Sequence, residues 1–431
     1  MKRTYQDIMD HAKDFMNDRF GMFIHWGIYS VASKGEWYQA AEQVSPQEYY
    51  RYFEQFDPVD YDPKKWAKLA KEAGMKYAVM TAKHHDGFCL FDSAYTDYKA
   101  TNTKAKRDLI REYADAFRAE GIKVGLYYSL LDWHHPDFPV YEDRMHPMRG
   151  REEIKEAEKD KCWERYTEYM QNQVRELLTK YGKIDEMWFD YSYDIMIGEK
   201  WDATNMMKLV KKLQPQIMVN NRMGGDLRVE NPVIYAGDYL SPEQIIPSRG
   251  LTNYKGLPMP WETCTTLNRH WGYCSDDHLY MNAKVAIRGL VECVSKGGNF
   301  LLNIGPDAKG NIPVEAEEIL KGIGVWMKKN HESIYGCGMS ELEKPEWGRY
   351  TQKGNKLYAH IFDRGIGPIA IEGLKDKIKY ARLLSDGTEA PITIPWNHIH
   401  ANCENAIFYK PEGTMLEDDI DTVLEIELLE E

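Results

Sequence analysis

Several short apolar runs in this sequence end on side chains that can hold or attack a small molecule. The run over residues 77–82 is followed by Lys83, His84, His85 and Asp86, and the run over 186–189 ends on Asp190. Other runs close on a similar set: His25 and Trp26, Tyr127 and Tyr128, Trp188, Asn221 and Arg222, and Glu262. Carboxylates can act as nucleophile, acid or base, whereas His, Tyr, Trp and Arg donate hydrogen bonds to hydroxyls. This inventory predicts a glycosidase.

The elements that must position these side chains alternate between strands and helices. Apolar runs near residues 21–27, 76–83, 123–129, 186–190, 217–222, 261–264 and 299–305 are separated by segments with helical periodicity. This alternation predicts a parallel sheet with helices outside. Seven strands, with room for an eighth, favour an α/β fold of the (β/α)8-like barrel type, because no glycine-rich phosphate loop follows the first strand. Barrel active sites lie at the carboxyl ends of the strands, so these side chains should converge.

Beyond residue 340 the pattern changes to short strands without intervening helices. The segments 356–362, 369–374, 380–385, 406–411 and 422–429 are separated by turn residues. They predict a small antiparallel β-domain. We therefore expect a catalytic domain over residues 1–340 and a C-terminal β-domain over residues 341–431.

Composition and charge restrict the partners of the chain. Its 431 residues are 43% hydrophobic and carry a formal net charge of −13. No cluster of Lys and Arg with interleaved aromatic residues is present, so we expect no nucleic-acid partner. No apolar stretch approaches the ~20 residues of a membrane span, and no signal peptide is evident, which predicts a cytoplasmic protein without membrane contact. Seven cysteines without a CxxC or paired spacing indicate reduced thiols.

Longer stretches resemble one known family. They are residues 19–31 with 35–38, 77–93, 124–138, 187–190, 220–222, 261–273 and 297–313. These stretches strongly resemble the α-L-fucosidases of glycoside hydrolase family 29, and they occur in the same order along the chain as in that family. The resemblance implies a barrel-like catalytic domain, a C-terminal antiparallel β-sandwich and a retaining exo-hydrolase that removes a terminal α-linked L-fucose through a covalent glycosyl-enzyme. It implies a fucosylated oligosaccharide or glycoconjugate as substrate, with no cofactor and no metal. A homo-oligomer is compatible with the sequence.

The resemblance also implies catalytic roles. Asp190 matches the family nucleophile and should remain ionised beside the cationic Arg222. A retaining mechanism needs a second carboxyl group about 5–5.5 Å away as acid/base. Three glutamates stay open for this role: Glu243 in the loop after the run 217–222, Glu262 at a strand end, and Glu36 in the sequence GEWY.

A further set of residues matches the family's sugar-binding positions. The set comprises His25, Glu36, Trp37, His84, His85, Tyr128, Trp188 and Arg222. We expect the histidines to bind the hydroxyls of the sugar, with ring tautomers fixed by neighbours such as Asp86. His134 and His135 either line the leaving-group side or order their loop. The glycines and prolines of residues 297–313 are expected to form turns that close the barrel.

One departure from the family and three rival interpretations remain. Family members commonly place glycine after the nucleophile, whereas this chain has Tyr191, so the leaving-group preference cannot be carried over. A metal-dependent barrel hydrolase would use the clustered His and Asp residues, but adjacent histidines on a regular strand point to opposite faces. A catalytically silent protein of the same fold would bind fucose without cleaving its glycosides. L-galactose differs from L-fucose by one hydroxyl, which an apolar pocket would disfavour by about 1–3 kcal/mol.

Overall fold

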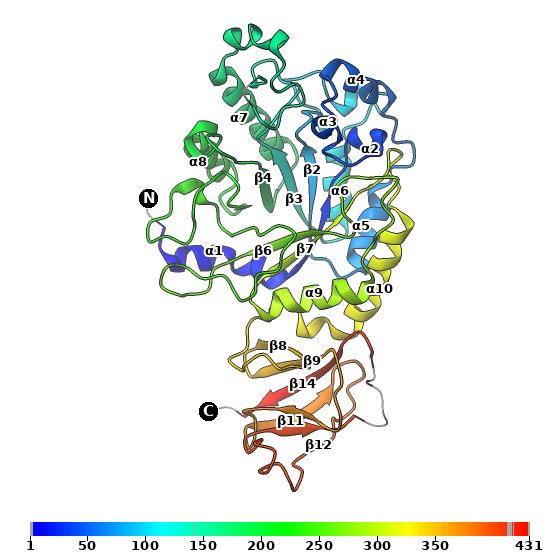
Figure 1. Ribbon diagram of the computed structural model, residues 1–431, viewed down its shortest axis with the longest axis vertical. Helices are drawn as coiled ribbons and strands as arrows, with labels where there is room; N and C mark the ends of the chain where they lie inside the picture. The colour runs from blue at the N-terminus through cyan, green and yellow to red at the C-terminus, as the bar shows by residue number, and fades with distance from the viewer. Residues whose placement is uncertain (1–2, 142, 412–415, 417, 430–431) are drawn as a thin grey trace.

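A curled sheet of seven parallel strands organises the first three quarters of the molecule (Figure 1). The computed structural model describes residues 3–141, 143–411, 416 and 418–429. Along the sheet the strand order is β5-β4-β3-β2-β1-β7-β6. The strands are β1 (Phe20–Ile24), β2 (Tyr77–Lys83), β3 (Lys123–Ser129), β4 (Glu186–Asp190), β5 (Met218–Val219), β6 (Glu262–Thr266) and β7 (Asn299–Ile304). Each overlaps a run that the sequence predicted, although β1 begins one residue before its run and β6 ends two residues after its run.

The two edges of the sheet are joined by a short irregular segment. Residues 239–243 make single parallel bridges to both edges: Asn220 with Tyr239, Leu240 with Trp261, and Glu243 with Cys264. We call residues 239–243 the seam. It occupies the place of an eighth strand, and it completes the predicted barrel-like domain.

Helices cover the outside of the sheet and return the chain to its starting end (Figure 1). Several begin after capping residues: Asp62, Asp108 and Asn282 each accept hydrogen bonds from first-turn amides. The helices are α1 (Tyr5–Asp18), α2 (Tyr29–Ala32), α3 (Tyr38–Ala41), α4 (Pro46–Gln55), α5 (Pro63–Glu72), α6 (Leu109–Ala119), α7 (Trp163–Lys180), α8 (Ala203–Leu213), α9 (Ala283–Ser295) and α10 (Val314–Asn330).

Both faces of the sheet are buried, and they contribute to two different cores. Phe23, Val79, Tyr127 and Trp188 fill the interior of the barrel, where Phe15 of α1 joins them. Because side chains alternate along a strand, the neighbours of these residues point to the helices. The alternation of side chains along each strand therefore decides which aromatic residues face the barrel interior and which face the helices.

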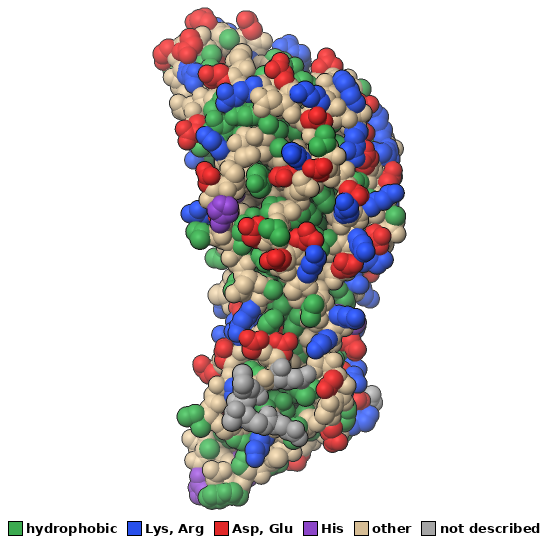
Figure 2. All heavy atoms as spheres, turned by 90° about the vertical axis from the view of Figure 1, so that its right-hand side faces the viewer, with side chains coloured by type: hydrophobic (Ala, Val, Ile, Leu, Met, Phe, Trp, Pro, Cys, Tyr) green, Lys and Arg blue, Asp and Glu red, His purple; other side chains and the backbone are tan. Residues whose placement is uncertain are grey.

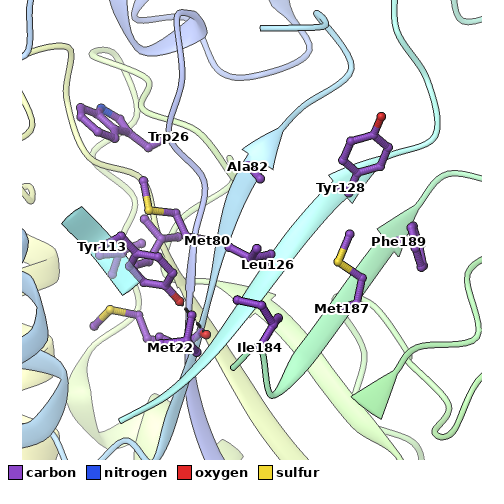
Figure 3. Packing of buried hydrophobic residues seen from close by; sticks show 14 of the residues in the cluster. Met22, Trp26, Met80, Ala82, Tyr113, Leu126, Tyr128, Ile184, Met187 and Phe189 are labelled. Atoms are coloured by element: carbon purple, nitrogen blue, oxygen red, sulfur yellow. Dashed lines mark hydrogen bonds between the residues drawn. The ribbon is translucent and has the colours of Figure 1, made fainter. Parts of the chain in front are cut away.

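The outer core lies between the sheet and its helices (Figure 3). Leu126, Tyr128, Met187 and Phe189 belong to it. The hydroxyl of Tyr128 donates a hydrogen bond to Gln173 of α7, over a distance of 2.8 Å. Tyr128 therefore belongs to the strand–helix packing, on the face opposite to its neighbour Tyr127.

The C-terminal part forms two antiparallel sheets around a core of its own. One sheet has the order β11-β14-β9-β8 and the other β10-β13-β12. The strands are β8 (Gly348–Lys353), β9 (Lys356–Ile361), β10 (Ile369–Ile371), β11 (Ile378–Leu383), β12 (Ile392–Thr393), β13 (Ile407–Tyr409) and β14 (Thr422–Leu428). The predicted β-sandwich is confirmed, and β8 and β12 are additional to the predicted strands. The side chains of Arg349 and Glu292 form an ion pair of 2.5 Å between β8 and α9.

Basic and acidic side chains are interspersed on the face of the molecule in Figure 2. Among the described residues, no helix has both the length and the apolar composition needed to cross a bilayer.

Candidate active site

A cavity of about 930 Å³ opens at the carboxyl ends of the strands. Most of the residues that the sequence predicted line this cavity: His25, Trp37, His84, His85, Trp188, Asp190, Arg222 and Glu243. They come from the ends of β1, β2, β4 and β5, from the turn before α3, and from the seam. The convergence follows from the parallel sheet, whose strand ends all meet at one edge.

Asp190 is the last residue of β4, and its carboxylate faces the cavity. Tyr127 Oη donates to Asp190 Oδ2 over 2.9 Å, and Arg222 Nη1 lies 3.4 Å from Asp190 Oδ1. Burial raises the pKa of Asp190 to about 6, against the opposing effects of Arg222 and the Tyr127 hydrogen bond. Asp190 is therefore ionised at neutral pH, as predicted, but it titrates only just below neutrality.

Glu243 lies on the seam and shares its ion-pair partner with Asp190. Arg222 Nη1 is 2.9 Å from Glu243 Oε2 and 3.4 Å from Asp190 Oδ1. Because both oxygens contact the same nitrogen, the distance between them cannot exceed the sum of these two distances. That sum is below roughly 6.5 Å, the lower limit of the carboxyl spacing in inverting glycosidases. The pair is thus close enough for the roughly 5–5.5 Å spacing of retaining enzymes.

Arg222 connects the nucleophile candidate, the seam and the aromatic floor of the cavity. Its guanidinium lies 4.8 Å above the ring of Trp188 and donates from Nη2 to the backbone oxygen of Ser241 over 3.0 Å. A planar guanidinium suits this work, because it can stack on a ring and hydrogen-bond at its edge at once. Its position orients both carboxylates.

The three predicted histidines lie together and are neutral. Burial lowers the pKa of His25 to about 3 and those of His84 and His85 well below the usual value. Their rings are positioned by groups other than the predicted Asp86: His25 Nδ1 lies 2.7 Å from Asn303 Oδ1, and His85 Nδ1 lies 2.6 Å from the hydroxyl oxygen of Ser129. A neutral imidazole both donates and accepts hydrogen bonds, which suits sugar hydroxyls.

His84 and His85 can both reach the cavity because they lie beyond the regular strand. Strand β2 ends at Lys83, after a register shift against β3 between Thr81 and Lys83. The rule that adjacent side chains point to opposite faces no longer applies there. The two rings are 4.1 Å apart between centroids, and both line the cavity. Asp86 instead accepts hydrogen bonds from the Phe88 amide and the Tyr49 hydroxyl.

Three predicted residues do not line the cavity. Tyr128 faces α7, and its neighbour Tyr127 takes the predicted place. Glu262 is fully buried below the cavity, where it accepts hydrogen bonds from Tyr77 Oη and Trp188 Nε1, and burial raises its pKa to about 8. Glu36 accepts the Gly272 amide over 2.8 Å. This placement favours Glu243 as acid/base and leaves the other two glutamates to support aromatic and backbone groups.

The sequence analysis did not assign Phe23 and Trp271 to the site, and it listed Tyr127 only as a strand-end residue, although all three line the cavity. Phe23 could have been found from side-chain alternation along its own strand, because it lies two residues before His25 and therefore on the same face. Trp271 follows β6 in an irregular segment, and its ring lies 5.0 Å from that of His25. Asn303 lies in the segment 297–313 that was expected to be structural. It links His25 and Trp271, because its side chain contacts His25 Nδ1 and donates to the Trp271 backbone oxygen over 2.7 Å.

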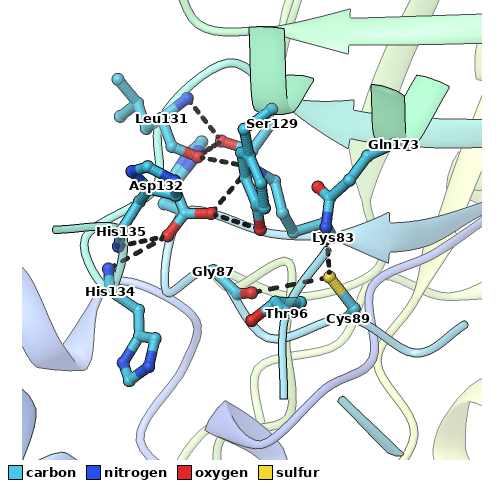
Figure 4. A network of polar contacts seen from close by, with 12 residues as sticks. Lys83, Gly87, Cys89, Thr96, Ser129, Leu131, Asp132, His134, His135 and Gln173 are labelled. Carbon is cyan, nitrogen blue, oxygen red and sulfur yellow. Dashed lines mark hydrogen bonds and ion pairs between the residues drawn. The ribbon is translucent and has the colours of Figure 1, made fainter. Parts of the chain in front are cut away.

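A buried ion pair supports the loops beside the histidines (Figure 4). Lys83 Nζ lies 3.1 Å from Asp132 Oδ2, and both side chains are at most 1% exposed. Asp132 also accepts the backbone amides of His134 and His135. Glycine at position 87 allows the backbone there to lie close to the Asp132 side chain, because a Cβ at this position would lie 2.1 Å from Asp132 Oδ1. His134 and His135 lie outside the cavity lining, which agrees with a role in ordering their loop.

We expect Lys83→Met to lower the free energy of unfolding by about 3–5 kcal/mol, because it leaves a buried carboxylate without its cation. Urea denaturation followed by fluorescence would measure the change. The double variant Lys83→Met with Asp132→Asn should recover much of the loss, since it removes the buried charge and keeps an acceptor for the amides. Lys68→Met breaks the exposed pair with Glu72 and should cost at most about 0.5 kcal/mol. Equal costs for Lys83→Met and Lys68→Met would contradict this account.

Among the described residues, no group of three or more His, Cys, Asp and Glu side chains is arranged to hold a metal ion.

With two carboxylates this close together at the open end of a barrel-like sheet, the molecule falls into the class of glycoside hydrolases. Comparison with known proteins defines it further. The family model for α-L-fucosidase matches residues 2–332. The tissue α-L-fucosidase of Homo sapiens is 30% identical over 375 residues, which are 80% of this chain and 74% of the human protein. The chain belongs to the α-L-fucosidase family, glycoside hydrolase family 29.

Solved structures agree with this assignment. α-L-Fucosidase isoenzyme 1 from Paenibacillus thiaminolyticus is 57% identical, with a TM-score of 0.95 over 98% of this chain and 100% of that one. A family 29 α-L-fucosidase from Bacteroides thetaiotaomicron, trapped as a covalent intermediate with 2-fluoro-fucosyl fluoride, is 28% identical with a TM-score of 0.83 over 100% of this chain and 97% of that one. The predicted family, fold and enzyme class are confirmed.

Proposed function

We propose that this α-L-fucosidase removes terminal α-linked L-fucose from fucosylated oligosaccharides or glycoconjugates, with Asp190 as nucleophile and Glu243 as acid/base. The observation that carries the proposal is the contact of both carboxylates with the same nitrogen of Arg222. Retention is supported by their closeness and by the covalent intermediate trapped in the Bacteroides enzyme.

In the first step, Asp190 Oδ attacks the anomeric carbon as the bond to the leaving oxygen breaks. Glu243, protonated, gives its proton to that oxygen, and a β-linked fucosyl ester forms on Asp190. In the second step, Glu243 takes a proton from water, the water oxygen bonds to the anomeric carbon, and the ester bond breaks. Two inversions leave L-fucose in the α configuration.

The inner cavity supplies the binding groups. Neutral His25, His84 and His85 offer donors and acceptors to the sugar hydroxyls, and His84 Nδ1 has no hydrogen-bond partner among the described residues. The rings of Trp188 and Trp271 offer apolar faces for the C–H groups of the pyranose. A cavity with these neutral polar groups and apolar ring faces suits a sugar better than a charged or a fully apolar ligand.

Release of 4-nitrophenol from its α-L-fucoside tests the function, and NMR spectra taken early in the reaction identify the first anomer of fucose. We expect α-L-fucose to form first and the β anomer to follow by mutarotation. A β anomer formed first would exclude retention, and no release from any α-L-fucoside would exclude the activity.

The pH dependence of kcat/KM should show an acid limb near pH 6. Only ionised Asp190 can attack, so kcat/KM should fall about tenfold per pH unit below the pKa of about 6. Tyr127→Phe removes a hydrogen bond that stabilises the ionised form, so the limb should move to higher pH. Tyr128→Phe, altered on the other face of β3, should leave it in place. An acid limb that stays fixed in Tyr127→Phe would argue against Asp190 as the group that titrates.

We also propose a reducing compartment such as the cytoplasm. The supporting observation is that all seven cysteines, each within the described part of the chain, are unpaired. Fractionation of the producing cells would test this location, and recovery of the protein outside the cytoplasm would contradict it.

A further inference from the structure

The residue after the candidate nucleophile has a backbone conformation that favours glycine. Tyr191 has a φ of 146°, a region in which a side chain with a Cβ is strained. Members of the family that this chain resembles commonly have glycine at this position. The chain therefore keeps the conformation of a glycine and adds a large side chain to it. Strain of this kind persists where surrounding contacts impose it, and it concentrates at functional sites.

Three aromatic rings hold the side chain of Tyr191. Its ring centroid lies 5.6 Å from Trp37, 5.3 Å from His85 and 5.4 Å from Tyr193, with interplanar angles of 60°, 74° and 61°. Edge-to-face contacts of this geometry are favourable and directional. They fix the orientation of the ring beside Asp190, and the half-buried ring lines the cavity.

Tyr191 lines the same cavity as both candidate reacting carboxylates, Asp190 and Glu243. Burial raises the pKa of Tyr191, and Asp190 and Glu243 raise it further. The leaving oxygen must lie near Glu243 when it receives its proton. The group attached to that oxygen therefore departs past the region that Tyr191 borders.

The cavity continues outward from this point along a different set of residues. Ile197, Asp226, Arg228 and Leu251 line it there, on the loops that follow β4, β5 and the seam. Asp226 and Arg228 form an ion pair of 3.0 Å and are about half exposed, at 45% and 55%. Their charges balance, so the outer cavity suits a neutral ligand with both apolar faces and hydroxyl groups.

We propose that Tyr191 forms the wall of a leaving-group subsite, where its ring packs on the face of a neutral ring such as the next pyranose of a glycan. The inference rests on the function proposed above and names the residue that sets its leaving-group preference. Tyr191 binds the departing group, and the strain in its backbone is the cost of placing an aromatic ring directly beside the nucleophile.

Two substrates separate this role from a general one. 4-Nitrophenyl α-L-fucoside carries a ring on its leaving oxygen, whereas α-L-fucosyl fluoride loses a single fluoride ion. We expect Tyr191→Ala and Tyr191→Gly to lower kcat/KM at least tenfold more on the nitrophenyl glycoside, and on a fucosyl disaccharide, than on the fluoride. Tyr191→Phe retains the ring and should keep the wild-type ratio. An equal loss on fluoride and glycosides would overturn the proposal.

The strain has a separate test in thermal stability. At position 191, the Gly variant should melt at a higher temperature than the Ala variant, because only glycine relieves the backbone. At Tyr193, whose φ is not positive, the order should be the reverse. A higher melting temperature for the Ala variant than for the Gly variant at both positions would show that the backbone of Tyr191 is not strained. Wild-type protein inactive on all three substrates would instead refute the proposed function itself.

Discussion

Asp190→Gly is expected to reduce turnover of 4-nitrophenyl α-L-fucoside by a factor on the order of 10⁴ to 10⁶, the range seen when a covalent nucleophile is removed. The cavity should still bind the sugar, because the histidines and tryptophans remain. Added azide can enter the space of the missing carboxylate and attack the anomeric carbon once, so the product should be β-L-fucosyl azide. Steady-state kinetics and NMR of the azide product would measure both effects.

A control just before the same strand separates chemistry from folding. Asp185 precedes β4 at the opposite end from the cavity, where it accepts the Val124 amide and pairs with Lys183. Asp185→Asn should keep kcat within a few-fold of wild type. If Asp190→Gly retained a tenth of wild-type kcat, or if azide gave the α product, Asp190 would not be the nucleophile.

Glu243→Gln should have the second largest effect, and its size should depend on the leaving group. Loss of a general acid typically costs about 10²- to 10⁴-fold. In kcat/KM, which reports the first step, natural glycosides should suffer the full loss because their leaving oxygen needs a proton, whereas fucosyl fluoride should suffer far less. Azide needs no general base, so it should intercept the fucosyl ester and give α-L-fucosyl azide, the opposite anomer from that of Asp190→Gly.

Glu262→Gln is the matched control for this variant. Its carboxyl group lies below the cavity on Trp188 and Tyr77, so the loss should be similar for all leaving groups and insensitive to azide. If azide rescued Glu262→Gln and not Glu243→Gln, the acid would be Glu262, and the shared contact on Arg222 would have another purpose.

Sequence patterns predicted the barrel strands because each is a short apolar run bounded by turns. They also predicted the side chains that end those strands, since parallel strand ends converge by geometry alone. Asp190 at the end of β4 and Arg222 shortly after β5 could be placed in the cavity from these positions alone. Glu243 was harder, because it lies on the seam, where no hydrophobic period marks a strand.

The errors in the site have a common physical origin. Strands of a parallel sheet are buried on both faces, so hydrophobicity does not reveal which of Tyr127 and Tyr128 faces the interior. Hydrophobicity also does not reveal depth: Glu262 faces inward, but it is the first residue of β6 and lies below the cavity. Asp86 was expected to orient the histidines, but the chain turns after Lys83 and leaves that role to Asn303 and Ser129. Contacts between distant segments decide these points.

The seam gives the two carboxylates different freedom to change over evolution. Asp190 ends a strand that is paired on both sides, so moving it would require repacking of β3, β4 and the helices outside them. Glu243 is carried by a segment attached through single bridges, which can be lengthened, shortened or replaced while the rest of the barrel persists. The proposed nucleophile is thus tied to the architecture, whereas the proposed proton donor can be relocated on another version of the same linking segment.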